Sequence, residues 1–194
     1  MLRVDLLRHG ALAGGIKYRG HTDDPLTKQG RADMDMVWQQ LAAEVDIIIT
    51  SPLSRCSDAA NDWAAQSGTP CIIEPRIAEM HYGTWEGKTG EAISAEFPGM
   101  LEQWRRDPTG MRPPGGESAE ELHQRLQSWL MEVSTSYQNK KLLVVSHSGT
   151  LRMLIALALR APIASTRHMD MPYACWSRLY CDGEGTRLAF HQRA

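Results

Sequence analysis

Three segments of this chain repeat one pattern, and the repetition is the strongest constraint on the fold. A short apolar stretch ends in polar residues within RVDLLRHG, after residues 45–49 and after residues 142–145. Helix-like patterns follow, over residues 53–66 with Gly68 as the stop, and from about Thr150. Strands that alternate with helices favour a mostly parallel sheet covered on both faces. The sequence therefore predicts a three-layer α/β/α sandwich.

Further elements fill the spaces between these units. Strands are expected at residues 71–74, 174–181 and 186–191, the last two joined at a sheet edge by a hairpin turn over 182–185. Thr27 is expected to cap a helix that begins near Lys28. Ser118 and Glu121 form a capping box for another helix, whose apolar face contains Leu122, Leu126, Trp129, Leu130 and Val133.

Between about residues 80 and 116 the pattern loosens, with glycine, proline and aromatic residues among charged ones. We expect a small helical lid insertion here, placed over the sheet. A length of 194 residues suits one domain with a sizeable core, so residues 1–194 are predicted to form a single domain.

Composition excludes several classes of partner. The chain is 42% hydrophobic and 23% charged with a formal net charge of −2, and no basic run suggests a nucleic-acid partner. The longest apolar run, residues 153–159, is too short to cross a bilayer. The beginning of the chain lacks a secretory leader pattern, and its four cysteines lack CxxC spacing. These features predict a cytoplasmic protein with reduced thiols; they carry no signal for oligomeric state.

Polar, donor-rich residues follow each of the three predicted strands. Arg8 and His9 follow the first, residues 51–55 the second, and residues 146–149 the third. The carboxyl ends of parallel strands meet at one edge of a sheet, and helix N-termini there favour anions. Singly, these residues also fit a strand-end pair, a helix-surface arginine and a core histidine. Together they predict one pocket with two arginines and two histidines.

A zinc site is the alternative reading of two histidines near a glutamate. Two guanidinium groups would repel a divalent cation, and no HxH or HxxxH spacing is present. Guanidinium groups instead match the oxygens of phosphate in a bidentate fashion. The sequence therefore predicts a phosphate pocket with no metal and no cofactor.

Six motifs, in order over residues 3–159, resemble the histidine phosphatase superfamily, which includes cofactor-dependent phosphoglycerate mutases and many small-molecule phosphatases. They are LLRHG, YRGHTDDPLTKQG, SPLSRCSDAA, EMHYGTWEG, PPGGES and VVSHSG. The resemblance implies that His9 is the nucleophile that becomes phosphohistidine. It implies that Arg8, Arg55 and His147 hold the phosphate and that Glu79 donates the proton, with Glu86 and His81 as rival acids.

The resemblance also implies substrate-binding residues, namely Thr22, Tyr82 and Ser148. Ser148 stands where many relatives have glycine or asparagine, and Tyr82 is alternatively a residue that packs the lid. Elementary chemistry agrees with the role of His9, because the cationic neighbours Arg8 and Arg55 disfavour its protonation. Burial beside a phosphate dianion likewise favours the protonated form of Glu79 that an acid needs.

The short lid and the run YRGHTD most resemble the branch containing α-ribazole-5'-phosphate phosphatase, an enzyme of cobalamin nucleotide-loop assembly. The expected partner is thus a small-molecule phosphomonoester, α-ribazole 5'-phosphate. A phosphoglycerate mutase, whose family members carry a longer insertion, and a broad-specificity sugar-phosphate phosphatase are alternatives. A catalytically silent phosphate-binding module is a third, although the chain keeps every residue that the chemistry needs.

Overall fold

The computed structural model describes residues 1–182 and 185–193, and within them six strands form one sheet in the order β3-β2-β4-β1-β5-β6. β1 to β4 run parallel, while β5 is antiparallel to β1 and β6 to β5. The predicted mostly parallel sheet is thereby confirmed. The hairpin turn predicted at 182–185 includes Gly183 and Glu184, which lie outside the described residues. The strands are β1 (Leu2–Arg8), β2 (Ile47–Thr50), β3 (Cys71–Ile73), β4 (Lys141–Ser146), β5 (Trp176–Asp182) and β6 (Gly185–Arg193).

Local capping residues mark the start of two helices and the end of another. Thr27 caps the first by accepting a hydrogen bond from the Gly30 N–H, and Ser118 and Glu121 form the predicted capping box. Gly68 adopts a left-handed conformation after the second helix. The α-helices are α1 (Lys28–Leu41), α2 (Ser54–Ser67), α3 (Gly90–Glu96), α4 (Met100–Arg106), α5 (Ala119–Ser136) and α6 (Ser148–Ala158); 3₁₀ helices span Pro75–Ile77, Gly83–Trp85 and Ile163–His168.

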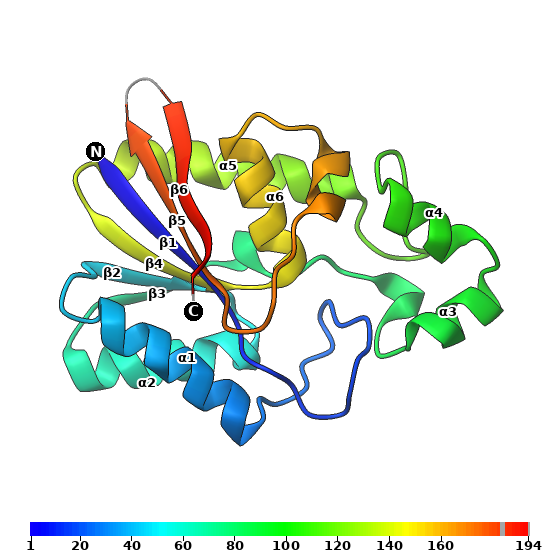
Figure 1. The fold of residues 1–194 in the computed structure, drawn as a ribbon, viewed down its shortest axis with the longest axis horizontal. Coiled ribbons are helices and arrows are strands. Elements are labelled where there is room, and N and C mark those ends of the chain that lie inside the picture. Colours follow the sequence, from blue (N-terminus) through cyan, green and yellow to red (C-terminus); the bar gives the residue numbers. More distant parts are fainter. Residues whose placement is uncertain (183–184, 194) are drawn as a thin grey trace.

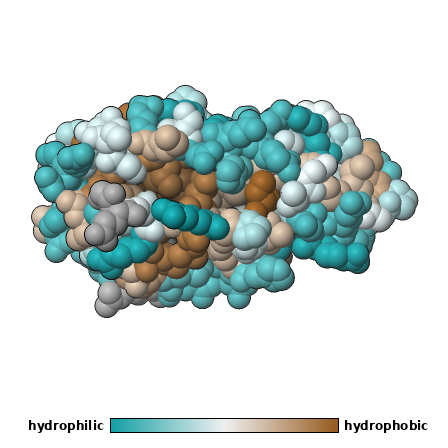
Figure 2. All heavy atoms as spheres, turned by 90° about the horizontal axis from the view of Figure 1, so that it is seen from above, coloured by the Kyte–Doolittle hydropathy of each residue, from teal (hydrophilic) through white to brown (hydrophobic). Residues whose placement is uncertain are grey.

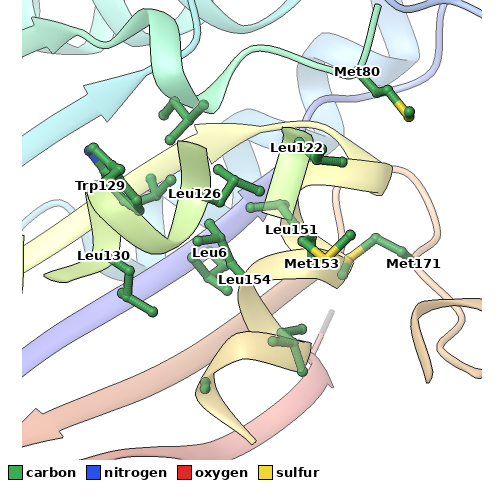
Figure 3. Close-up of a cluster of buried hydrophobic side chains, with 14 of the residues drawn as sticks. Leu6, Met80, Leu122, Leu126, Trp129, Leu130, Leu151, Met153, Leu154 and Met171 are labelled. Atoms are coloured by element: carbon green, nitrogen blue, oxygen red, sulfur yellow. The ribbon is translucent and has the colours of Figure 1, made fainter. Parts of the chain in front are cut away.

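The sheet lies between two helical layers, with α1 and α2 on one face and α5 and α6 on the other (Figure 1). Along β4, Leu142 and Val144 pack into the cluster with α5 and α6, and Leu143 and Val145 into the cluster with α1 and α2. Figure 3 shows the first cluster, where Leu6 of β1 lies among side chains from α5 and α6. Burial on both faces explains why β4 reads as a continuous apolar run.

The segment between residues 80 and 116 is helical, as predicted, but its position differs. α3 and α4 lie beyond the carboxyl ends of the parallel strands rather than over a face of the sheet (Figure 1). Trp85 and Trp104 are buried there and pack edge to face with ring centroids 5.9 Å apart. Both tryptophans belong to the same hydrophobic cluster as the side chains of α5 and α6, so they anchor this segment to the main core.

One predicted helix, expected from about Thr150, starts slightly earlier. The helix after β4 begins at Ser148, two residues before the expected Thr150, because His147 is still extended (φ −125°, ψ 162°) and occupies the N-cap position. Gly149 and Thr150 therefore lie in the first helical turn. Their backbone N–H groups have no partner within the helix and are free to bind other acceptors.

The face seen from above has a hydrophobic recess (Figure 2). Separately, Leu130 and Met131 of α5, Leu157 of α6 and Cys181 of β5 are among the residues that line a surface pocket. Across residues 1–182 and 185–193, no helix is long and apolar enough to cross a membrane.

The loop after β1 packs directly on the first turn of α1. A Cβ added to Gly30 would lie 2.4 Å from the backbone N and O of Ala11. Gly30→Ala should therefore lower the free energy of unfolding by about 1–3 kcal/mol through overpacking, although alanine is the better helix former. Urea unfolding measures the change, with Gly90→Ala as control, because its added methyl meets first the flexible end of Arg105. A Gly30→Ala variant as stable as the control would contradict the close backbone contact.

Candidate active site

The carboxyl ends of β1, β2 and β4 bring three predicted residues together. Arg8 pairs with Ser146 across the parallel strands β1 and β4, so His9 and His147 leave the sheet side by side. Their ring centroids lie 5.3 Å apart. Arg55, in the first turn of α2, donates a hydrogen bond from Nε to His147 Nδ1 at 3.1 Å.

His9 is oriented by its own neighbour in the chain. Its Nδ1 lies 2.8 Å from the carbonyl oxygen of Gly10. Because a carbonyl only accepts, Nδ1 carries the hydrogen and the lone pair is on Nε2. Burial, and secondarily the positive charge of Arg8, lower the pKa of His9 to about 3. The side chain is thus a neutral imidazole with a fixed tautomer.

Arg8 is held by the loop that precedes β5. It donates from a terminal nitrogen to the carbonyl of Met171, and its guanidinium lies over the Tyr173 ring, 4.0 Å from the centroid. Burial lowers the pKa of Arg8, and its buried Nε has no hydrogen-bond partner. Tyr173 also lies near His9, with ring centroids 5.7 Å apart.

Arg55 and His147 lie deeper than His9. Arg55 is 1% exposed and donates to backbone carbonyls of the loop 19–22 and to Asp23, besides His147. Since Nδ1 of His147 accepts from Arg55, its Nε2 donates to Ser51 Oγ at 2.7 Å. Burial, then Arg55, hold the pKa of His147 well below its usual value. Neither Arg55 nor His147 lines the pocket above His9 that is described below. Direct contact of these two residues with phosphate therefore stays a prediction.

Glu79 is fixed at the N-terminus of α6. Its Oε1 accepts hydrogen bonds from the Thr150 N–H and hydroxyl and from the Met80 N–H, at 3.0–3.1 Å. Its Oε2 accepts one, from the Gly149 N–H at 3.0 Å. A Cβ on Gly149 would lie 2.7 Å from the carboxylate, which accounts for the glycine of the VVSHSG motif. Oε2 therefore has one donor where Oε1 has three.

The two rival acids have other surroundings. Glu86 accepts hydrogen bonds from the backbone N–H groups of residues 20–22 and Tyr82. Although its burial acts in the opposite direction, these bonds lower the pKa of Glu86. His81 packs edge to face against His21, with centroids 4.9 Å apart. Through its hydrogen bonds to residues 20–22, Glu86 connects the lid to the loop after β1.

A pocket of about 260 Å³ opens above His9. His9, Arg8 and Glu79 line it, as do Tyr82 and Ser148 of the predicted substrate-binding residues, whereas Thr22 does not. Five more cations line it that sequence reasoning missed: Lys17, Arg19, Arg105, Arg152 and Arg167.

Two of these missed cations had a local sequence signal, and one of them, Arg19, lies within the motif YRGHTDDPLTKQG. Arg152 lies four residues after Ser148 on the same helix, and this spacing places both on one face. Arg167 reaches the pocket through a 3₁₀ helix remote from every motif.

Comparison with known proteins identifies the family. Residues 4–193 match the model of the histidine phosphatase superfamily (branch 1). The adenosylcobalamin/alpha-ribazole phosphatase of Salmonella typhimurium is 29% identical over all of this chain and 98% of its own length. Phosphoserine phosphatase 1 of Hydrogenobacter thermophilus is 29% identical over 94% of this chain and 88% of its own length.

A solved structure agrees over the whole fold. Mycobacterial glucosyl-3-phosphoglycerate phosphatase, in complex with VO3, superimposes with a TM-score of 0.89 at 28% identity, covering 99% of both chains. The strand-end arrangement of the site and the match over residues 4–193 lead to one conclusion: this chain belongs to branch 1 of the histidine phosphatase superfamily, a family of phosphatase enzymes.

Proposed function

We propose that this chain hydrolyses a small-molecule phosphomonoester through a phosphohistidine on His9. The observation that carries the proposal is the state of His9, a neutral imidazole whose Nδ1 hydrogen is engaged by Gly10 and whose Nε2 lone pair is available. A neutral nitrogen with a lone pair is the form that attacks phosphorus. Arg8, in the same pocket, supplies positive charge for the phosphate.

In the first step, Nε2 of His9 forms a bond to phosphorus as the bond from phosphorus to the leaving oxygen breaks. Glu79 gives its proton to that oxygen, so the alcohol departs neutral. In the second step, water attacks phosphorus, the phosphorus–nitrogen bond breaks, and its electrons return to Nε2. The Glu79 carboxylate takes the proton from water, and inorganic phosphate is released.

Positive charge balances the phosphate in both steps, and the proposal uses no metal. Arg8 meets the equatorial oxygens from the pocket wall, and Arg55 acts from behind His9 and His147. Charge placed in advance around a transferring phosphoryl group is most effective in the transition state.

Two substrates are candidates, and α-ribazole 5'-phosphate is the first, supported by the name of the Salmonella relative. A phosphorylated acid is the second candidate. It is supported by the names of the phosphoserine and glucosyl-3-phosphoglycerate phosphatases and by the surplus of cations around the pocket. A cytoplasmic location and a single domain over residues 1–194 remain predictions from the sequence.

The nucleophile is tested by removal. His9→Ala should lower turnover of p-nitrophenyl phosphate by about 10³-fold or more, because the attacking atom is lost. His123→Ala, on α5 and outside the pocket lining, is the matched control and should keep its activity. If His9→Ala hydrolysed p-nitrophenyl phosphate as fast as His123→Ala, His9 would be ruled out as the nucleophile, and another group or water itself would attack phosphorus.

The protonation state of His9 is tested by NMR titration of its ring. Its pKa of about 3 lies below the ordinary 6.5, so its Cε1 resonance should stay at the neutral position from pH 8 to pH 5. His9→Gln assigns the signal. Over the window between 6.5 and 3 the unfolded chain gains a proton that the folded chain does not, so this group lowers stability as pH falls. A titration midpoint of His9 near pH 6.5 would contradict the buried, neutral state on which the mechanism depends.

The proton donor is tested by varying the leaving group. Glu79→Gln keeps the size of the side chain but has no proton to give, and a positioned acid contributes ~10²–10⁴-fold. Turnover should therefore fall steeply for α-ribazole 5'-phosphate, whose alkoxide is strongly basic, and only mildly for p-nitrophenyl phosphate.

Glu86→Gln, run in parallel, is the control for the rival acid. Equal losses on the two esters would make Glu79 a positioning residue. A leaving-group-dependent loss in Glu86→Gln would transfer the acid role there.

A further inference from the structure

Arg152 and Arg167 line the pocket but have no part in the two steps above. Arg152 lies on α6, one turn after Ser148, which lines the same pocket. Arg167 belongs to the 3₁₀ helix Ile163–His168, which packs against α6. Two neighbouring elements thus bring two guanidinium groups to one pocket.

Arg152 is held in a position that disfavours a cation. Its Nε is buried without a hydrogen-bond partner. Burial first, and the positive charge of Arg167 second, lower the pKa of Arg152. Glu79 attracts Arg152, but both oxygens of Glu79 accept hydrogen bonds from Met80, Gly149 and Thr150. A partly desolvated guanidinium beside another cation lowers the stability of the folded protein unless an anion pairs with it.

Arg19 and Arg8 have other partners or roles, whereas Arg167 has few partners. Arg19 pairs with Asp24 at 2.6 Å and donates to the carbonyls of Ala13 and Gly15. Arg8 faces the transferred phosphate in the proposed mechanism. Arg167, in the part of the chain that the structure describes, donates one hydrogen bond, from Nε to the Arg105 carbonyl at 3.3 Å. Its terminal nitrogens are therefore available to a ligand, and Arg152 lines the same pocket.

We propose that Arg152 and Arg167 form a second anion-binding subsite, so that the natural substrate is a phosphomonoester with a second acidic group, a carboxylate or a phosphate. The inference rests on the proposed hydrolysis at His9 and names its substrate class. A phosphate over His9 draws on Arg8 and Arg55 and leaves the pair at α6 uncompensated. A second anionic group on the same molecule neutralises that pair through charge-assisted hydrogen bonds. This selects the phosphorylated acid over α-ribazole 5'-phosphate.

A different role for Arg152 makes a different prediction. If Arg152 only positions Glu79 or adds to the field on the transferred phosphate, its removal lowers turnover of every phosphomonoester by a similar factor. A subsite for a second anion instead produces a loss confined to substrates that carry that anion. The ratio of two losses, rather than one rate, therefore decides between the roles.

Two matched pairs of substrates measure this ratio. 3-Phosphoglycerate and glycerol 3-phosphate differ by a carboxylate in place of a hydroxymethyl group. Fructose 1,6-bisphosphate and fructose 6-phosphate differ by a second phosphate. We expect the wild-type protein to prefer the member with two acidic groups in at least one pair, measured as kcat/KM; the pair that shows the preference tells a carboxylate from a phosphate.

Arg152→Met and Arg167→Met should reduce that preference by about 10- to 100-fold, the range for loss of a hydrogen bond to a charged group. Arg106→Met, at the exposed end of α4, removes the same charge outside the pocket and should leave the preference unchanged. Arg152→Lys should recover part of it. Equal losses on both members of each pair, or no preference in the wild type, would overturn the subsite.

Two further measurements distinguish failure of the proposed subsite from failure of the proposed hydrolysis. Turnover of p-nitrophenyl phosphate by the wild type tests hydrolysis itself, so a protein that hydrolyses it without preferring either diacid refutes the subsite alone. A wild type that hydrolyses none of these esters refutes the proposed function. Arg152→Met should also raise the Tm of the ligand-free protein, because it removes a half-buried cation that lies near Arg167. A lowered Tm would show that Arg152 is already satisfied within the fold and overturn the proposal.

Discussion

The parallel pairing of β1 with β4 is the contact on which the rest of the site depends. Because Arg8 lies opposite Ser146, His9 and His147 leave the sheet as neighbours, and α6 begins directly behind them. The free N–H groups of that first turn then hold Glu79 at the same edge. The nucleophile and the proposed acid are therefore placed by one register, and a shift of that register would separate them.

Burial at this edge of the sheet sets the protonation state of the two histidines. It keeps His9 and His147 neutral, and the arginines beside them act in the same direction. β1, which ends directly before His9, is fixed by the buried carboxylate of Asp5, since it accepts hydrogen bonds from Trp176 and Arg178 of β5. β1 is thus held on both sides, by β4 through its register and by β5 through this network.

The sheet, the caps and the meeting of the strand ends followed from local patterns. Thr27, Gly68 and the Ser118 capping box act within one turn of chain, so sequence is enough to find them. The early start of α6 was missed because His147 makes no side-chain capping bond, which leaves no cap signal. The depth of Arg55, the tautomer of His9 and the arrival of Arg167 depend on contacts between distant elements. No spacing in the sequence encodes such contacts.

The central claim is that His9 itself carries the phosphoryl group between the two steps. Wild-type protein mixed with a ³²P-labelled phosphomonoester and stopped in alkali within milliseconds should carry label that survives alkali and is lost in acid, the behaviour of a phosphorus–nitrogen bond. Peptide mapping should then place the label on His9. Label on Ser146 or Ser148, or label that acid leaves in place, would contradict the account.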